Sequence, residues 1–280
     1  MDKLLIVDGS NLLFQMFYGM PARIVNQQGK AIQGTLGFVG ALLKIIRMVT
    51  PTHVVVIFDG ECDNTRTQMD ADYKANRPDY SQIPEEDTPF SQLPDIYRAL
   101  DVLRIAHAET TDCEADDWIA SYALTYGTET DVVIVSQDSD FFQLISDRVR
   151  ILRYRGKNTV FCDRAWLKEK FDISPEQYAD FKSLTGDHAD NIKGAEKIGP
   201  KTAAQLLGQF GTLENLLQNI DTVKRPSIRQ SLQRNIPRLR TNYCLIRLNA
   251  TDQLPFPPDK MAYWEAGMST TQILTALDLR

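Results

Sequence analysis

The chain has few of the residues that build disulfides or soft-metal sites. Its 280 residues include only four cysteines, widely spaced and without a Cys-x-x-Cys pair. The three histidines show no spacing typical of metal ligands. These absences argue against structural zinc and for a reducing compartment, so we expect a cytoplasmic protein.

Long apolar runs are also missing. The run after Lys3 covers only Leu4–Val7 before Asp8 interrupts it, so no signal peptide is indicated. No run approaches the length of a membrane span. With 43% apolar and 24% charged residues, the composition is that of a soluble globular protein of one large or two modest domains.

The net charge of −6 hides a strong segregation of charge. Residues 101–147 contain eleven acidic residues and one basic residue, whereas residues 193–247 contain ten basic and three acidic residues. A solvated charged face would explain either half alone but not their separation. The pattern fits a metal site beside a phosphate-binding surface.

Three short apolar runs predict buried parallel strands: Leu4–Val7, Val54–Phe58 and Val132–Val135. Segments of helical periodicity separate them, notably Leu36–Val49 and Trp118–Tyr126. Strands alternating with helices predict an α/β fold with a parallel sheet.

Acidic residues gather at the ends of these elements. Asp8, Asp59, Asp138 and Asp140 follow strands, and Glu114, Asp116 and Asp117 open a helix. Because ligands of parallel sheets lie at the carboxyl ends of the strands, we expect the two clusters to face each other there. One such aspartate is usually a turn cap, but this many together indicate a site. Salt bridges within residues 101–147 cannot neutralise them, whereas Mg²⁺ or Mn²⁺ with oxygen ligands can.

The segment Thr65–Pro94 is polar, contains four prolines and is too long for a simple connection. We expect a mobile or partly helical flap above the strand ends. Within it, Tyr73–Arg77 combines an aromatic ring with two cations, a combination suited to stacking on a base and touching phosphates.

The second half of the chain turns helical after Val149–Tyr154 and Thr159–Cys162, which we expect as edge strands. Asp187 and Asp190 are expected on one face of a helical turn. The glycine-rich stretch Gly194–Ala203 precedes a segment of helical apolar periodicity and predicts a phosphate site formed by backbone N–H groups. Ile198 is expected to anchor this stretch in the core. An ordinary helical hairpin would show the same glycine and proline pattern.

Seven motifs in order resemble the 5′-nuclease family of flap endonucleases and polymerase-type 5′→3′ exonucleases: VDGSN, FDG, DYKANR, CEADD, SQDSD, GDHADN and GAEKIGPKTA. The resemblance covers Leu4 to about Leu217. It implies a PIN-like α/β core at 1–165 with a helical arch at 65–94. It also implies a helical DNA-binding region at 166–280, with a helix–three-turn–helix motif at about 185–217.

The resemblance also implies residue roles. It implies a site for two Mg²⁺ ions, for which Mn²⁺ could substitute. Nine carboxylates would either coordinate these ions or contact the residues that do: Asp8, Asp59, Glu114, Asp116, Asp117, Asp138, Asp140, Asp187 and Asp190. Lys74 and Arg77 would act on the scissile phosphate. Further DNA contacts would come from Arg66, Tyr73, Gly194, Ile198, Gly199, Lys201 and Thr202, with a K⁺ ion at the helix–three-turn–helix.

Two departures from the family pattern stand out. Gln15 occupies a position where arginine is common, which implies the loss of a substrate contact, and Lys193 and Lys197 replace a common proline and glycine. Neither departure touches the predicted metal ligands. No polymerase domain follows, so we expect a stand-alone enzyme or an excised domain.

The resulting hypothesis is a monomeric, structure-specific 5′ nuclease of replication and repair. It would hydrolyse DNA with a 5′ flap, nick or branched end by a two-metal mechanism. One alternative is a DNA-junction binder without catalysis, which predicts missing carboxylates. Another is a PIN-type ribonuclease, which would lack the long flap and the basic hairpin.

Overall fold

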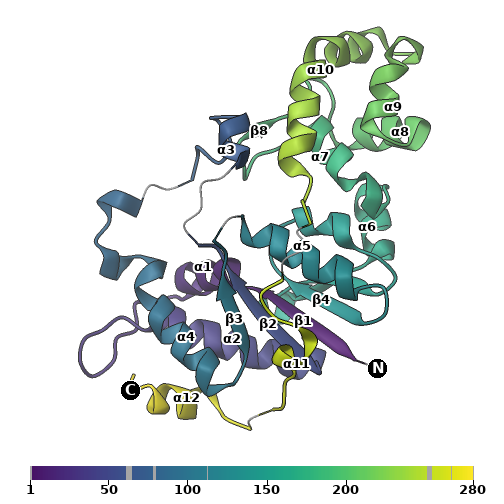
Figure 1. The fold of residues 1–280 in the computed structure, drawn as a ribbon. Coiled ribbons are helices and arrows are strands. Elements are labelled where there is room, and N and C mark those ends of the chain that lie inside the picture. Colours follow the sequence, from purple (N-terminus) through teal and green to yellow (C-terminus); the bar gives the residue numbers. More distant parts are fainter. Residues whose placement is uncertain are drawn as a thin grey trace.

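A six-stranded sheet forms the centre of the computed structural model (Figure 1), which describes residues 2–60, 65–77, 80–111, 113–250, 254–265 and 267–279. The strand order is β3-β2-β1-β4-β5-β6. The bounds are β1 (Lys3–Asp8), β2 (His53–Phe58), β3 (Ala106–Glu109), β4 (Asp131–Val135), β5 (Val149–Arg153) and β6 (Val160–Cys162). The first five strands are parallel, and β6 pairs antiparallel with β5. The predicted α/β fold class is confirmed.

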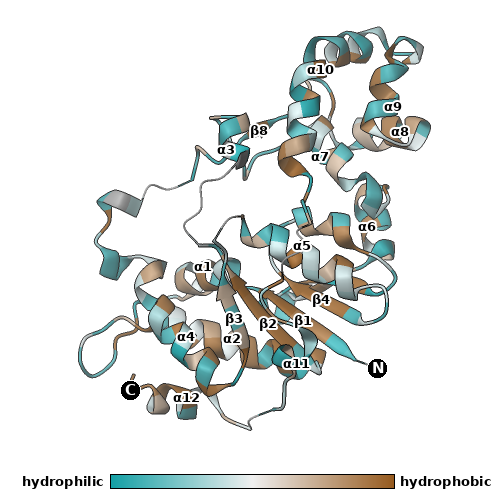
Figure 2. Ribbon diagram, viewed as in Figure 1, coloured by the Kyte–Doolittle hydropathy of each residue, from teal (hydrophilic) through white to brown (hydrophobic). Residues whose placement is uncertain are grey.

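The sheet is apolar on both faces, as Figure 2 shows for β1, β2 and β4. Leu4 and Ile6 of β1 enter one core cluster, and Leu5 and Val7 enter the other. All three predicted strands are present. The prediction that Val149–Tyr154 forms an edge strand is wrong, because β5 lies between β4 and β6.

Helices cover both faces of the sheet. One core cluster joins it to α2 (Gln33–Val49), α4 (Leu93–Val102) and part of α1 (Gly9–Gly19). The other joins it to α5 (Ala115–Tyr126) and to the helical region that follows β6. Both faces are therefore closed, which leaves the strand ends as the place where polar groups can gather.

The helical region stands beyond the carboxyl ends of the strands (Figure 1). It consists of α6 (Arg164–Phe171), α7 (Tyr178–Thr185), the hairpin β7–β8 (Gly186–Asp187 and Ile192–Lys193), α8 (Pro200–Phe210), α9 (Leu213–Gln218) and α10 (Pro226–Ile246). Ile198 is buried in the core cluster that also contains α5 and α8 residues, so its predicted anchoring role is confirmed.

The prediction that Asp187 and Asp190 lie on a helical turn is wrong, because they lie on the β7–β8 hairpin. Gly186 ends α7 at φ +82°, and a Cβ there would lie 2.5 Å from Gly194 N. The Asp187 carboxylate accepts a hydrogen bond from Ala189 N at 2.9 Å. This local bond favours a turn over a continued helix.

The segment predicted as a flap is only partly helical. It contains α3 (Thr65–Met69) and three 3₁₀ turns at Tyr80–Gln82, Glu85–Asp87 and Pro89–Gln92, while residues 78 and 79 lie outside the described residues. Its middle is tied to the β7–β8 hairpin, because Lys74 N donates to Asp190 O at 3.0 Å.

The C-terminal segment returns to the α/β core instead of extending the helical region. Its two helices, α11 (Pro258–Met261) and α12 (Thr270–Ala276), contribute buried residues to the two core clusters. Tyr263 N donates to Thr52 O at 2.8 Å beside β2. No described helix is long and apolar enough to cross a membrane, and no disulfide joins the described cysteines.

The buried side chain of Tyr122 on α5 anchors the start of this returning segment. Its hydroxyl accepts a hydrogen bond from Phe256 N at 3.0 Å and donates one to Phe256 O at 3.2 Å. Tyr122→Phe should lower the free energy of unfolding by about 1–3 kcal/mol, because both backbone groups lose their partner. Urea unfolding measures this loss. Tyr126→Phe removes a hydroxyl with no hydrogen bond among the described residues and serves as the control; an equal loss there would contradict the anchoring role.

Candidate active site

Four aspartates from four elements meet at the carboxyl edge of the sheet, as predicted. Asp8 ends β1, Asp59 follows β2, Asp116 lies in the first turn of α5, and Asp138 follows β4. Their charges act on one another: Asp59 and Asp138 raise the pKa of Asp8. Asp138, Asp8 and Asp59 likewise raise the pKa of Asp116.

Backbone and hydroxyl donors hold these carboxylates in place. Asp8 accepts from Asn11 N at 2.9 Å, capping α1, and from Ser136 Oγ at 2.8 Å. Asp59 accepts from Ala115 N at 2.9 Å, at the start of α5. The helix starts and strand ends are therefore joined through the acidic side chains themselves.

Burial and like charge make these groups difficult to ionise. Asp8 is 5% exposed, and burial, with the charges of Asp59 and Asp138, raises its pKa to about 7 despite hydrogen bonds from Asn11 and Ser136. Burial, followed by the charge of Asp138, holds the pKa of Asp116 well above its usual range. A nearby cation would stabilise the ionised forms.

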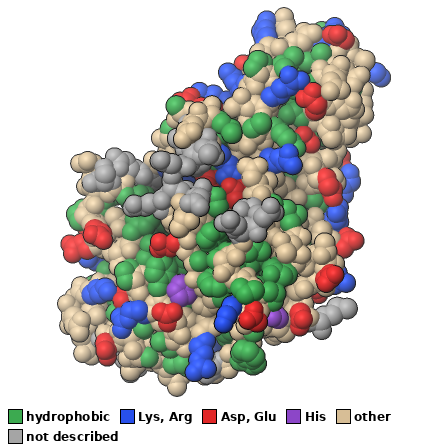
Figure 3. All heavy atoms as spheres, viewed as in Figure 1, with side chains coloured by type: hydrophobic (Ala, Val, Ile, Leu, Met, Phe, Trp, Pro, Cys, Tyr) green, Lys and Arg blue, Asp and Glu red, His purple; other side chains and the backbone are tan. Residues whose placement is uncertain are grey.

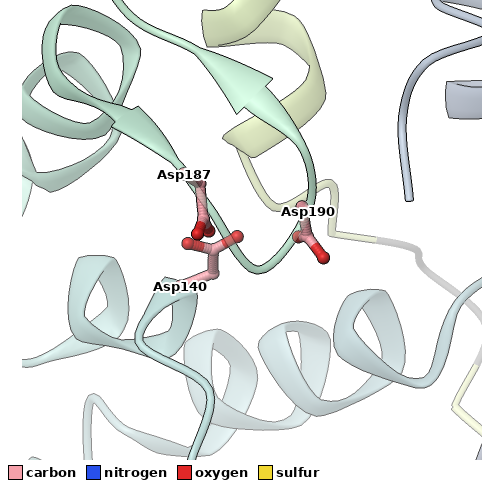
Figure 4. Close-up of side chains that lie close together, drawn as sticks. All are labelled: Asp140, Asp187 and Asp190. Atoms are coloured by element: carbon pink, nitrogen blue, oxygen red, sulfur yellow. The ribbon is translucent and has the colours of Figure 1, made fainter. Parts of the chain in front are cut away.

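A second group consists of Asp140, Asp187 and Asp190. One carboxylate oxygen from each lies within 4.8 Å of the others. Figure 4 shows Asp140 and Asp187 pointing toward one another, with Asp190 on the turn of the β7–β8 hairpin. The hairpin thus brings two predicted ligands to the third, although the local structure is not the predicted helical turn.

Asp138 connects the two groups. Its Oδ1 accepts a hydrogen bond from Asp140 N at 2.8 Å. Its charge raises the pKa of Asp8 and Asp116 in the first group and of Asp140 and Asp190 in the second. The carboxylates therefore form one continuous acidic site.

Lys182 is a site residue that the sequence reasoning missed. Its ammonium forms ion pairs with both Asp140 and Asp187, and its side chain is only 6% exposed. Burial lowers the pKa of Lys182, but the charges of these carboxylates outweigh it and raise the pKa overall. In the sequence, the spacing indicates this burial: Lys182 follows Tyr178 by four residues and therefore lies on the apolar face of α7.

The pKa of Asp140 reflects the same competition. Burial raises it to about 7, while the charge of Lys182 acts in the opposite direction. The internal ammonium therefore offsets only part of the cost of ionising this carboxylate.

The prediction that Arg66 contacts DNA does not agree with its position. Arg66 is 4% exposed and forms ion pairs with Glu114 and, at 2.8 Å, with Asp117. Asp117 also accepts from Asn249 N at 3.0 Å, after the end of α10. Through these contacts, Arg66 and Asp117 connect α3, α5 and the chain after α10.

The two cations predicted to act on phosphate do lie at the site, and both are paired with carboxylates. Lys74 Nζ lies 2.6 Å from Glu114 Oε1, and Arg77 Nη2 lies 3.2 Å from Asp190 Oδ1. The side chain of Arg77 is 57% exposed, whereas that of Lys74 is 15% exposed.

The prediction that the Tyr73 ring stacks on a base also disagrees with the structure. Tyr73 is 6% exposed and packs in a cluster with Ala179, Ile192, Leu245 and Ile246. The apolar surface formed by α7, the β7–β8 hairpin and the end of α10 attracts the ring away from solvent.

The glycine-rich stretch leads into α8 as predicted. Gly199 is the N-cap residue, Pro200 occupies the first turn, and Lys201 is exposed beside the half-buried Thr202. Gly194 packs closely, because a Cβ would lie 2.4 Å from Thr185 C. On the visible face, basic side chains lie over the helical region with acidic ones between them (Figure 3).

The two departures from the family pattern have local structural consequences. Lys197 adopts φ +66°, a left-handed conformation in which glycine carries no steric cost. Gln15 Nε2 donates to Tyr154 O at 2.6 Å, so the side chain is used within the protein.

The donor set fits hard divalent cations. All the predicted ligands are carboxylates and several are buried; burial, with added repulsion between the carboxylates, raises the pKa of Asp8 and of Asp140 to about 7. Oxygen-only ligands are those that Mg²⁺ and Mn²⁺ prefer. Asp8, Asp59, Asp116 and Asp138 can serve one ion, and Asp138, Asp140, Asp187 and Asp190 a second.

Comparison with known sequences gives two adjoining matches. Residues 3–172 match the family described as 5′-3′ exonuclease, N-terminal resolvase-like domain, and residues 173–268 match its C-terminal SAM fold. The DNA polymerase I of Thermus aquaticus is 36% identical over 92% of this chain, and that of Rhizobium leguminosarum is 37% identical over 93%. The chain spans 29% and 26% of the length of these two polymerases.

Solved structures share the fold. The T5 D15 protein co-crystallised with metal ions superposes with a TM-score of 0.71 at 23% identity, covering 87% of this chain and 89% of that one. The catalytic core of Rad2 in complex with a DNA substrate superposes with a TM-score of 0.62 at 17% identity, over 99% and 93% of the two chains. With the family matches spanning residues 3–268, this chain belongs to the 5′-3′ exonuclease family.

Proposed function

We propose that the chain is a divalent-metal-dependent 5′ nuclease that hydrolyses phosphodiester bonds of DNA carrying a 5′ flap, nick or branched end. The observation that carries this proposal is the continuous acidic site, in which Asp138 joins two groups of carboxylates at the strand ends. The proposal includes Mg²⁺ as the natural ion and action as a cytoplasmic monomer.

Bound divalent cations would supply Lewis-acid activation of water and of the scissile phosphate. The protein's own contribution is to hold the seven aspartates of the two groups in place through helix starts, strand ends and the β7–β8 hairpin. Ser136, Asn11 and Ala115 fix the orientation of Asp8 and Asp59 through hydrogen bonds. Such preorganisation lowers the cost of reaching the transition state.

Lys74 and Arg77 would exchange carboxylate partners for phosphate oxygens. Both now pair with predicted ligands, Glu114 and Asp190. If bound cations neutralised these two carboxylates, the Lys74 ammonium and the Arg77 guanidinium would be available for the negative charge of the substrate. The duplex would bind at Gly194–Thr202, where exposed Lys201 and the backbone at the start of α8 suit phosphate, and a K⁺ ion would bind there too.

Replacing Asp138 with asparagine tests the proposed function directly. Asp138→Asn should lower cleavage of a labelled 5′-flap substrate in Mg²⁺ by at least a factor of about 100, because both groups of ligands lose their shared charge. Binding of the same DNA in Ca²⁺ should persist, since the anion removed repels phosphate. Asp163→Asn, at the N-cap of α6 and outside the acidic site, is the matched control and should leave turnover unchanged. Near-normal turnover of Asp138→Asn would refute the assignment.

The raised pKa values predict an unusual pH dependence of stability without metal. Burial raises the pKa of Asp8 and of Asp140 to about 7 in the folded protein, well above the ordinary aspartate pKa of 3.8 in the unfolded chain. The stability contributed by these groups should therefore fall as pH rises from 3.8 to about 7, by about 1.4 kcal/mol per pKa unit and group.

Denaturant unfolding in a chelator, across this pH range, measures the effect. Asp8→Asn should flatten the decline, and added Mg²⁺ should raise stability more at neutral than at acidic pH. An identical pH profile for Asp8→Asn and the wild type would show that the Asp8 pKa is ordinary.

Lys182→Met tests the role of the internal ammonium. Without metal, and at a pH above 7 where Asp140 is ionised, it should lower the free energy of unfolding by about 3–5 kcal/mol, because Asp140 and Asp187 lose their buried counter-ion. Saturating Mg²⁺ should restore a larger share of stability in the variant than in the wild type. Lys168→Met, in an exposed pair with Asp172, is the control. If both variants lose equally little stability, the Lys182 ion pairs are not structural.

A further inference from the structure

The turn after β5 brings basic side chains to the edge of the sheet that carries the acidic site. β5 runs parallel to β4, with Leu152 beside Val135, so both strands end at the same edge. The chain then continues through Tyr154 into an exposed turn that contains Arg155 and Lys157. Arg155 therefore lies at the same edge of the sheet as Asp138, 17 positions further along the sequence.

Gln137 links this turn rigidly to the site. It stands between Ser136, which donates to Asp8, and Asp138. Its backbone N–H donates to Asn11 Oδ1 at 2.9 Å, and its carbonyl accepts from Arg153 Nη2 at 2.8 Å. The backbone of Gln137 is therefore fixed from α1 on one side and from β5 on the other.

The side chain of Gln137 holds Arg155. Its Oε1 accepts from Arg155 Nε at 2.7 Å, and its Nε2 donates to Tyr154 O at 2.9 Å. Gln15 Nε2 donates to the same carbonyl at 2.6 Å. Two glutamines thereby orient the backbone and the guanidinium at the start of the turn.

Among the described residues, Arg155 has no carboxylate partner, in contrast to the four cations that contact the acidic site. Arg66, Lys74, Arg77 and Lys182 all form ion pairs with acidic residues. Within the part of the chain that the structure describes, the Nη groups of Arg155 form no hydrogen bond or ion pair, and the residue is exposed. A guanidinium fixed through Nε presents its two terminal nitrogens as a fork suited to phosphate.

We propose that Arg155 binds a backbone phosphate of the DNA substrate on the β4–β5 side of the acidic site, and that Gln137 positions it. This inference rests on the proposed function for the identity of the ligand. Gln137 directly precedes Asp138 in the chain, so it holds the Arg155 guanidinium at a fixed distance from the acidic site, where a phosphate would react. This placement fits a phosphodiester better than an acidic peptide.

The test compares Arg155→Ala with Arg47→Ala, which removes the same charge from the last turn of α2, near the opposite ends of the strands. Affinity for a 5′-flap DNA is measured in Ca²⁺ across a salt series. Arg155→Ala should weaken binding about tenfold and reduce the slope of log K against log salt by about one. Arg47→Ala should change neither. Equal effects of the two variants, or a wild-type affinity and slope for Arg155→Ala, would overturn the proposal.

Further variants separate positioning from charge. Arg155→Lys should recover the salt slope but only part of the affinity, because lysine cannot use the Nε contact and the fork together. Gln137→Leu should weaken binding with Arg155 present and add little in the Arg155→Ala background. Full additivity of these two substitutions would mean that Gln137 does not act through Arg155. Thermal unfolding of each variant checks that the fold is kept.

Failure of this inference can be told apart from failure of the proposed function. If the wild type cleaves flap DNA in Mg²⁺ and Arg155→Ala binds normally, only the Arg155 contact is wrong. If the wild type binds DNA through Arg155 but cleaves no substrate with any divalent ion, the contact stands and the nuclease proposal fails.

Discussion

Repulsion among carboxylates at one edge of the sheet is the constraint on which the rest of the site depends. Parallel strands end side by side, so aspartates placed at their ends must share a small, partly buried volume. Burial, together with the neighbouring carboxylates, raises the pKa of Asp8 and of Asp140 to about 7, so ionising these groups is costly. Protons, internal cations or divalent ions can each relieve this cost. Only divalent ions leave every carboxylate ionised and also provide a charge for phosphate, which explains why a fold would keep so costly an arrangement.

The internal cations fall into two classes by burial. Arg66 and Lys182, with side chains 5% and 6% exposed, are enclosed and each bridges two carboxylates. Moving either would leave charges buried without partners, so they act as permanent counter-ions. Lys74 and Arg77 each form one ion pair with a carboxylate, and the Arg77 side chain is 57% exposed. Breaking these ion pairs should cost less free energy, and these are the two cations that the sequence pattern predicts to contact phosphate.

Much of the site could be predicted because its signals are local. An apolar run followed by aspartate marks a strand end, and a parallel sheet brings such ends together, so Asp8, Asp59 and Asp138 meet as expected. The direction in which Arg66 and Tyr73 point depends instead on α5, α7 and α10, which are distant in sequence. The sequence pattern therefore predicted DNA contacts for Arg66 and Tyr73, whereas packing buries both side chains. The pairing of Lys182 with Asp140 is similarly invisible without the tertiary structure, and the hairpin at Asp187 depends on the positive φ of Gly186.

The β7–β8 hairpin contacts three parts of the molecule that are distant from one another in the sequence. It carries Asp187 and Asp190 of the acidic site, and Asp190 contacts the segment at Lys74 and Arg77 through backbone and side chain. Asn242 of α10 donates to the carbonyls of Ser183 and Lys193, at 3.0 Å each, and so fastens the base of the hairpin to the helical region. One short hairpin, closed by the β7–β8 pairing, therefore contacts the acidic site, the segment that carries Lys74 and Arg77, and the helical region.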